Sequence, residues 1–211
     1  MGLWILSFCI MAIEVWGSIY FFETFMDRKR TGWLDKCRYA VLYIFCFVVA
    51  CLGGYYVPMG IKVLLMVLIL MAFCEVFYVA DWKQCIFFSG LNYSLLFLTD
   101  LFMMQMENMF VSQNDGPVFL LLSSKMIWLC VVFIVRKVWR GRNNYGELSR
   151  KEWLKFSIIP LLTVASMLLM YFCYSGDRKV QTASLFLTVG LMFLIFLGIE
   201  MMLGMLESEE L

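Results

Sequence analysis

Long apolar stretches separated by short polar breaks run along the whole chain. Because about 20 apolar residues span the hydrocarbon core of a bilayer, we expect seven of these stretches to be transmembrane helices. They lie at about residues 3–26, 39–57, 61–80, 84–106, 117–138, 154–174 and 182–206. The pattern therefore predicts an all-α polytopic membrane bundle of six to seven spans.

Basic residues gather in alternate loops of this predicted bundle. The first, third and fifth loops hold 13 of the 17 lysines and arginines, and the other loops hold three. The positive-inside rule places the odd loops in the cytoplasm, which predicts an N-terminus outside and a C-terminus inside. Tryptophans at the same predicted boundary form an aromatic belt of Trp33, Trp82, Trp139 and Trp153.

The composition supports a lipid environment. Hydrophobic residues make up 63% of the chain and charged residues 16%, whereas soluble domains carry about 25% charged residues. This composition excludes a water-soluble globular enzyme and a nucleic-acid module. The net charge of +1 gives no general attraction to polyanions. The lipid bilayer is thus an expected partner, and nucleic acid is not.

The chain contains no histidine. This absence removes the commonest general base at neutral pH, most zinc sites, Ser-His and Cys-His nucleophile pairs, and histidine phosphorylation. None of the eight cysteines forms a C-x-x-C pair, so buried thiols are favoured over a metal or redox site. Phosphate-binding loops and nucleophile-elbow motifs are also missing. No catalytic residue, metal or cofactor is predicted.

Two ionisable residues of opposite charge lie at similar depth in neighbouring spans. Asp100 is six residues from the outer end of the fourth span, and Lys125 is eight residues into the fifth. At 1.5 Å rise per residue, their depths differ by about 3 Å. A charge at mid-bilayer costs about 2.5–3.5 kcal/mol, so we expect them to pair across the helical hairpin. The pair is either a structural ion pair or the polar floor of an outward-facing pocket.

Two further features concern the last two spans. Pro160 removes a helical hydrogen bond, so it is expected to kink the sixth span and form a helix hinge. The last span runs into Glu207–Glu210 without a Gly or Pro stop signal. We therefore expect a membrane domain over 1–206 and the start of a cytoplasmic helix over 207–211. A short frayed tail is the other interpretation.

Several polar landmarks are similar to those of a known receptor class. They are Tyr20–Phe25, Leu148–Leu154 followed by Ile159–Leu161, and the span from Gly190 to Leu206 running into Glu207–Glu210. With the predicted helix number and orientation, they resemble the N-terminal transmembrane sensor region of Agr-type, GHKL-family peptide-sensing histidine kinases.

The resemblance implies a homodimeric quorum-sensing receptor of a two-component system in a bacterial plasma membrane. It would bind a secreted, often cyclic peptide and signal through the last span to a cytoplasmic kinase. The kinase half, with its phosphoacceptor histidine and ATP-binding boxes, is absent from this chain. The membrane peptidase that matures such peptides has a similar size, but it needs a Cys-His pair and is excluded.

The resemblance also implies ligand contacts on the outer loops and helix ends. The candidates are Tyr55, Tyr56, Met59, Met104, Gln105, Glu107, Asn108 and Tyr174. The alternative function is a small transporter or substrate-binding membrane subunit that uses Asp100 and Lys125 as its polar site. A third class is an assembly or structural membrane protein without a ligand.

Overall fold

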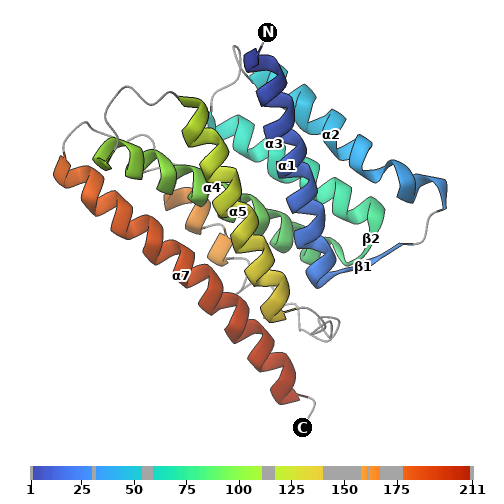
Figure 1. Cartoon of the computed structure of the whole chain (residues 1–211). Helices are drawn as coiled ribbons and strands as arrows, with labels where there is room; N and C mark the ends of the chain where they lie inside the picture. Colours follow the sequence, from blue (N-terminus) through green and yellow to red (C-terminus); the bar gives the residue numbers. More distant parts are fainter. Residues whose placement is uncertain are drawn as a thin grey trace. The chain divides into compact units, whose positions relative to one another are not determined.

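A computed structural model describes seven parts of the chain, and these parts are mostly helical (Figure 1). The described residues are 2–29, 32–53, 59–110, 117–139, 158–160, 162–166 and 178–209. Among them, three helices are long and apolar enough to cross a membrane. These helices are α1 (Gly2–Phe25), α4 (Trp82–Phe110) and α7 (Arg178–Glu209).

The chain divides into two compact units. The first unit comprises Met1–Tyr93 and Leu129–Asn143, and the second comprises Ser94–Trp128 and Asn144–Leu211. Helices α4 and α5 (Pro117–Trp139) contribute residues to both units.

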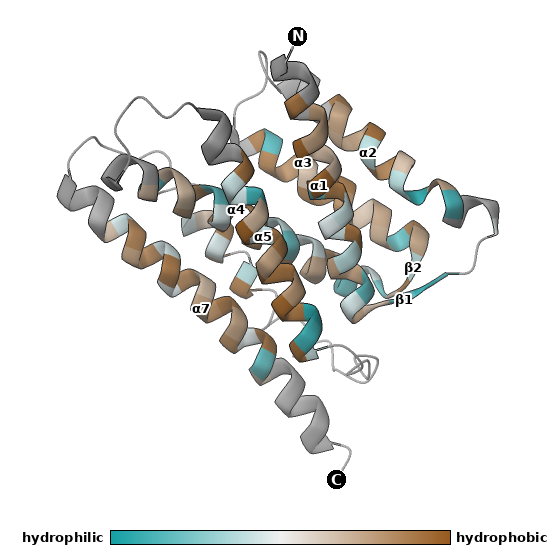
Figure 2. Cartoon of the chain, viewed as in Figure 1, coloured by the Kyte–Doolittle hydropathy of each residue, from teal (hydrophilic) through white to brown (hydrophobic). Residues whose placement is uncertain are grey.

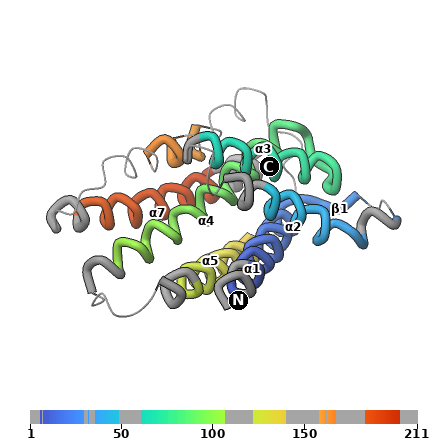
Figure 3. The backbone as a smooth tube through the Cα atoms, turned by 90° about the horizontal axis from the view of Figure 1, so that it is seen from above, coloured from blue at the N-terminus to red at the C-terminus, as the bar shows by residue number. Residues whose placement is uncertain are grey.

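The first unit is built on a row of three helices. Helix α2 (Trp33–Gly53) packs against both α1 and α3 (Met59–Phe77), and Figure 3 shows α2 and α3 side by side. Aromatic side chains fill the core: Phe25 stacks on Phe88 of α4 with ring centroids 4.7 Å apart, and Phe22 contacts Phe73 at 6.4 Å. These large buried rings therefore form much of the contact that α1 makes within the unit.

A short antiparallel ladder joins two loops of the first unit. Strand β1 (Asp27–Arg28) pairs with β2 (Tyr78–Val79), and the Lys29 N–H donates to the Phe77 carbonyl at 2.9 Å. The sequence pattern predicts an all-α bundle and does not include this ladder. Strands of two residues are too short to produce an alternating pattern of apolar and polar residues. Gly32 follows at φ 61°, a left-handed conformation that glycine adopts without strain, and α2 begins directly after it.

Several helix ends differ from the predicted span ends. Helix α2 begins at Trp33 rather than at 39, α3 ends at Phe77 rather than at 80, and α7 extends from Arg178 to Glu209. Hydropathy marks only the apolar part of a helix, whereas the backbone stays helical through charged residues at either end. In the predicted sixth span, 158–160 and 162–166 are helical, and the rest of 154–174 lies outside the described residues.

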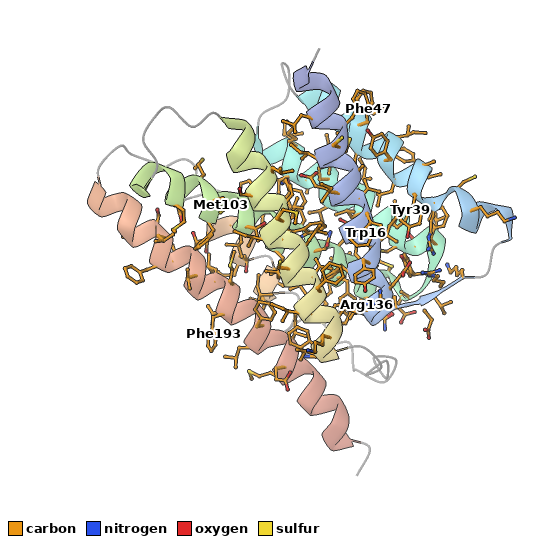
Figure 4. All side chains as sticks on the ribbon, viewed as in Figure 1. Trp16, Tyr39, Phe47, Met103, Arg136 and Phe193 are labelled. Atoms are coloured by element: carbon orange, nitrogen blue, oxygen red, sulfur yellow. The ribbon has the colours of Figure 1, made fainter. Side chains whose placement is uncertain are left out.

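Large apolar side chains remain exposed along the helices, and Figure 2 shows the hydrophobic colouring of α7. On α3, Leu64 is 59% exposed; on α7, Phe186 is 73% and Phe193 is 68% exposed. Phe193 projects away from its helix in Figure 4. Soluble monomers rarely expose large contiguous apolar patches, so these surfaces suit contact with lipid or with another apolar partner.

Candidate functional site

The oppositely charged pair of the second unit lies in direct contact. Lys125 Nζ on α5 donates to both carboxylate oxygens of Asp100 on α4, each at 2.7 Å. The Lys125 side chain is 3% exposed and that of Asp100 is 35% exposed. The hairpin α4–α5 thus buries an ammonium group and leaves part of its carboxylate partner accessible.

A second polar contact in this unit joins α4 to α7. The Thr188 hydroxyl lies 3.2 Å from Gln105 Oε1 and donates to the Ser184 carbonyl one turn earlier at 2.8 Å. Because a hydroxyl has one hydrogen, both contacts are satisfied together when the Gln105 amide is turned so that its NH2 group donates to Thr188. Gln105 and Thr188 are both buried, so this contact replaces water as the polar partner.

A close apolar contact links the Pro160 segment to α7. A Cβ added at Gly198 would lie 2.5 Å from Cδ1 of Ile159, the residue before the proline. Gly198 therefore allows Ile159 to rest directly on the α7 backbone. Pro160 is itself buried within a helical stretch, and Thr163 donates back to the Ile159 carbonyl at 2.8 Å. The expected hinge thus lies directly beside a contact with α7.

The predicted ligand contacts have different positions. Met104 is half-buried on α4, and Gln105 is buried against Thr188 instead of facing an open surface. Met59 begins α3, whereas Glu107 and Asn108 lie in the last turn of α4. Tyr55, Tyr56 and Tyr174 lie outside the described residues. Among the predicted ligand contacts, Gln105 is therefore joined to α7 by a hydrogen bond with Thr188.

The first unit contains a charged cluster that the sequence analysis missed. The Glu23 carboxylate on α1 is approached by three guanidinium groups: Arg28 at 2.5 Å, Arg38 at 3.1 Å and Arg136 at 3.8 Å. Glu23 and Arg38 are largely buried, with side chains 10% and 8% exposed. One carboxylate thus connects α1, β1, α2 and α5, and Figure 4 shows Arg136 at the end of α5 near the base of α1.

Aromatic groups surround this cluster. The Arg136 guanidinium lies over the Tyr20 ring, 3.7 Å from its centroid, a cation–π contact. Tyr78 of β2 donates to the Ile19 carbonyl at 3.4 Å. Burial, with the Glu23 charge as a smaller cause, raises the pKa of Tyr78 well above its usual value, so the hydroxyl keeps its proton. The Tyr20–Phe25 stretch therefore combines an ion cluster with an aromatic core.

Metal ligands do not gather in the described part of the chain. Its residues include no group of three or more His, Cys, Asp or Glu side chains that could hold a metal ion. The free thiols are Cys9, Cys37, Cys46, Cys74, Cys85 and Cys130.

Comparisons of the chain with protein-family models, curated proteins and solved structures give no match.

Proposed function

We propose that this chain is a membrane-embedded sensor domain of a two-component receptor. It binds an extracellular peptide-like signal and passes that signal through α7 to a cytoplasmic kinase. The observation that carries the proposal is the Thr188–Gln105 contact at 3.2 Å, which ties α7 to α4 at a residue expected near the ligand. The receptor class is proposed from the resemblance to Agr-type sensor regions.

The proposed topology has seven spans in a plasma membrane, with the N-terminus outside and the C-terminus inside. Helices α2, α3 and α5 have 21, 19 and 23 residues, and at 1.5 Å per residue each comes close to or exceeds the hydrocarbon thickness of about 30 Å. The β1–β2 ladder also brings the first and third loops together, as two loops on the same side of a membrane require.

Helix α7 has the length needed to carry a signal out of the membrane. Its 32 unbroken residues correspond to about 48 Å, whereas the hydrocarbon core is about 30 Å thick. Gln105 contacts it at Thr188, about a third of the way along the helix, and Ile159 contacts it at Gly198, ten residues or about 15 Å further along. A shift of α4 would thus act on α7 at Thr188, and a shift of the Pro160 segment would act on it at Gly198.

The chemical step belongs to the kinase in this proposal. A chain without histidine cannot hold the phosphoacceptor, so a kinase domain joined after α7 or on a separate polypeptide completes the receptor. The exposed apolar side chains Phe186 and Phe193 of α7 suit a homodimer in which two such helices lie side by side. Ligand binding would then change the relative position of the two α7 helices.

The proposal is tested by fusing the chain in helical register to a reporter histidine kinase. Culture medium of the source cells serves as the signal, and reporter transcription is the readout. Thr188→Val removes the hydroxyl that contacts Gln105, so we expect at least half of the signal-dependent response to be lost. The matched control is Thr24→Val on α1, which removes a buried hydroxyl bonded to the Tyr20 carbonyl of its own helix and should leave the response intact. Equal responses in both variants would contradict the coupling role.

Ligand contact is tested in the same fusion with alanine at Tyr55, Tyr56 and Tyr174. These substitutions should weaken the response to dilute medium and leave the unstimulated output unchanged, because they remove contact groups rather than the link to α7. A response that survives all three substitutions together would contradict the proposed location of the ligand site.

A second candidate function is a small transporter or substrate-binding membrane subunit. It is favoured by the unequal exposure of the Asp100–Lys125 pair, which leaves a carboxylate 35% exposed beside a buried ammonium group. In this alternative the pair is the polar site for the transported molecule. Substrate uptake that persists in the double variant Asp100→Asn with Lys125→Met would argue against it.

A further inference from the structure

An apolar groove lies between α2 and α3 in the first unit. It encloses about 280 Å³, and every side chain that lines it is apolar. Leu42 and Phe73 are buried and form its floor, whereas Phe45 and Val76 are 53% and 52% exposed at its rim. Because a wholly apolar cavity offers no hydrogen bonds to water, its occupant is expected to be apolar.

One end of the groove meets a basic segment. Phe77 lines the groove, and its carbonyl accepts a hydrogen bond from the Lys29 N–H at 2.9 Å. The Lys29 ammonium group donates to the Glu75 carbonyl at 2.6 Å, which holds this charge beside the end of α3. The segment 27–38 that contains Lys29 has five basic and two acidic residues. The apolar groove thus ends beside the Lys29 ammonium group, whereas Arg28 and Arg38 of the same segment pair with Glu23.

The length of the groove suits one leaflet of a bilayer. Its lining along α3 runs from Ile69 to Phe77, which is about 12 Å at 1.5 Å per residue. One leaflet contributes about half of the 30 Å hydrocarbon core, or about 15 Å. A transmembrane helix of a second copy would follow the full core, whereas an acyl chain entering from the basic side would end where this groove ends.

We infer that the groove binds an anionic phospholipid of the cytoplasmic leaflet, with one acyl chain between α2 and α3 and its phosphate beside Lys29. Anionic lipids are concentrated in that leaflet, and they attract lysine and arginine close to its surface. The inference rests on the proposed membrane placement of α2 and α3. It does not depend on the sensor function, because no step of the signal response enters the argument.

The first test uses the full chain purified in detergent with phosphatidylglycerol or phosphatidylcholine of identical acyl chains. Native mass spectrometry measures how much of each lipid the protein retains. The wild-type protein should retain phosphatidylglycerol in preference to phosphatidylcholine. Lys29→Met should reduce this preference about fivefold, the effect expected for one basic group near an anionic headgroup. Equal retention of both lipids by the wild-type protein overturns the inference.

The second test fills the groove. Ala72 lines it, and Ala72→Phe should lower phosphatidylglycerol retention more than about tenfold by occupying the space of the acyl chain. The matched control is Ala40→Phe, at an exposed position of α2 that does not line the groove. Unchanged lipid retention in Ala72→Phe overturns the inference, as does a switch from dimer to monomer with lipid retention intact, which would assign the groove to a second copy.

The two tests separate this inference from the sensor proposal. Lipid selectivity of the wild-type protein is measured without any variant, so it holds even if Ala72→Phe fails to fold. The reporter response of the kinase fusion is a separate readout. Loss of that response with preserved lipid selectivity would remove the sensor function alone.

Discussion

The two partners of the Asp100–Lys125 pair differ strongly in their access to water. Lys125 is 3% exposed and Asp100 is 35% exposed, although the two groups lie 2.7 Å apart. Surrounding water or lipid headgroups can therefore stabilise the carboxylate in part, but the ammonium group depends on its contacts within the protein. Removing one partner should not have the same effect as removing the other.

Asp100→Asn should destabilise the protein more than Lys125→Met. The first change leaves a buried ammonium group without its carboxylate, a situation that costs about 3–5 kcal/mol. The second removes the buried charge and leaves a carboxylate that is partly exposed. Thermal unfolding of the purified variants in detergent measures the difference as a larger fall in Tm for Asp100→Asn. Equal falls, or the reverse order, would contradict this account of the pair.

Glu23→Gln should destabilise the first unit. The change removes the negative charge that holds Arg28, Arg38 and Arg136 within 3.8 Å, so the guanidinium groups are left to repel one another. We expect a loss of about 3 kcal/mol, at the lower end of the range for a broken buried pair because Arg28 is 44% exposed.

Glu75→Gln is the matched control for this change, since it removes an exposed carboxylate from α3 of the same unit. Surface carboxylates contribute about 0–1 kcal/mol, so its unfolding temperature should stay close to that of the wild-type protein. Similar Tm values for the two variants would show that the Glu23 cluster adds little to stability.

The Asp100–Lys125 pair could be predicted from the sequence, whereas the Glu23 cluster could not. Asp100 and Lys125 lie on consecutive spans joined by one short loop, so their depths can be compared by counting residues. Glu23 binds Arg136 from a distant span, and nothing in the local pattern identifies that neighbour. The count of basic residues also assigns Arg136 to the fifth loop, although it lies at the end of the predicted span 117–138 and is largely buried against Tyr20.

Gly198 and Gly190 provide a matched comparison on α7. A Cβ at Gly198 would meet Ile159 at 2.5 Å, whereas one at Gly190 has nothing within 4 Å. Valine changes the helix propensity equally at both positions, so the difference between Gly198→Val and Gly190→Val reports the contact with Ile159. Gly198→Val should lower Tm further and should raise or lower the unstimulated output of the kinase fusion, while Gly190→Val should not change that output.

A rescue experiment checks the cause. Ile159→Ala shortens the side chain that Gly198→Val would strike, so the double variant should be more stable than the sum of the two single effects predicts. Additive effects on stability would show that the side chain at position 198 does not interact with Ile159. They would contradict the proposed contact between the Pro160 segment and α7.

Helices could be predicted from the sequence more reliably than their ends. The apolar centres of α1, α4 and α7 are 18, 25 and 19 residues long, close to or above the length of a membrane span of about 20 residues, so their existence follows from hydropathy. The first turns of α2 contain Asp35, Lys36 and Arg38, which hydropathy assigns to a loop although the backbone is helical. The β1–β2 ladder depends on two loops meeting in space, which a local pattern cannot express.

The segments at the two ends of α4 offer a test of the proposed topology. Its first residues belong to the first unit and its later residues to the second. Strand β2 before it pairs with β1 of the first loop, and the predicted loop after it contains Asp115. If α4 crosses the membrane, these two loops must face opposite sides, so labelling them tests the proposed topology where it joins both units.

Single cysteines at these two loops provide the measurement, in a background in which the native cysteines are replaced by alanine. Asp115→Cys should react with a membrane-impermeant maleimide on intact cells, because the proposed topology places it outside. Asp81→Cys should react only after the cells are permeabilised. It lies in the third loop, and Lys83 of that loop and the five basic residues of the first loop place both loops in the cytoplasm of the proposed topology. The reverse pattern would invert the whole bundle and move the groove lipid to the outer leaflet. Labelling of both positions on intact cells would show that α4 does not cross, and seven spans could then not be maintained.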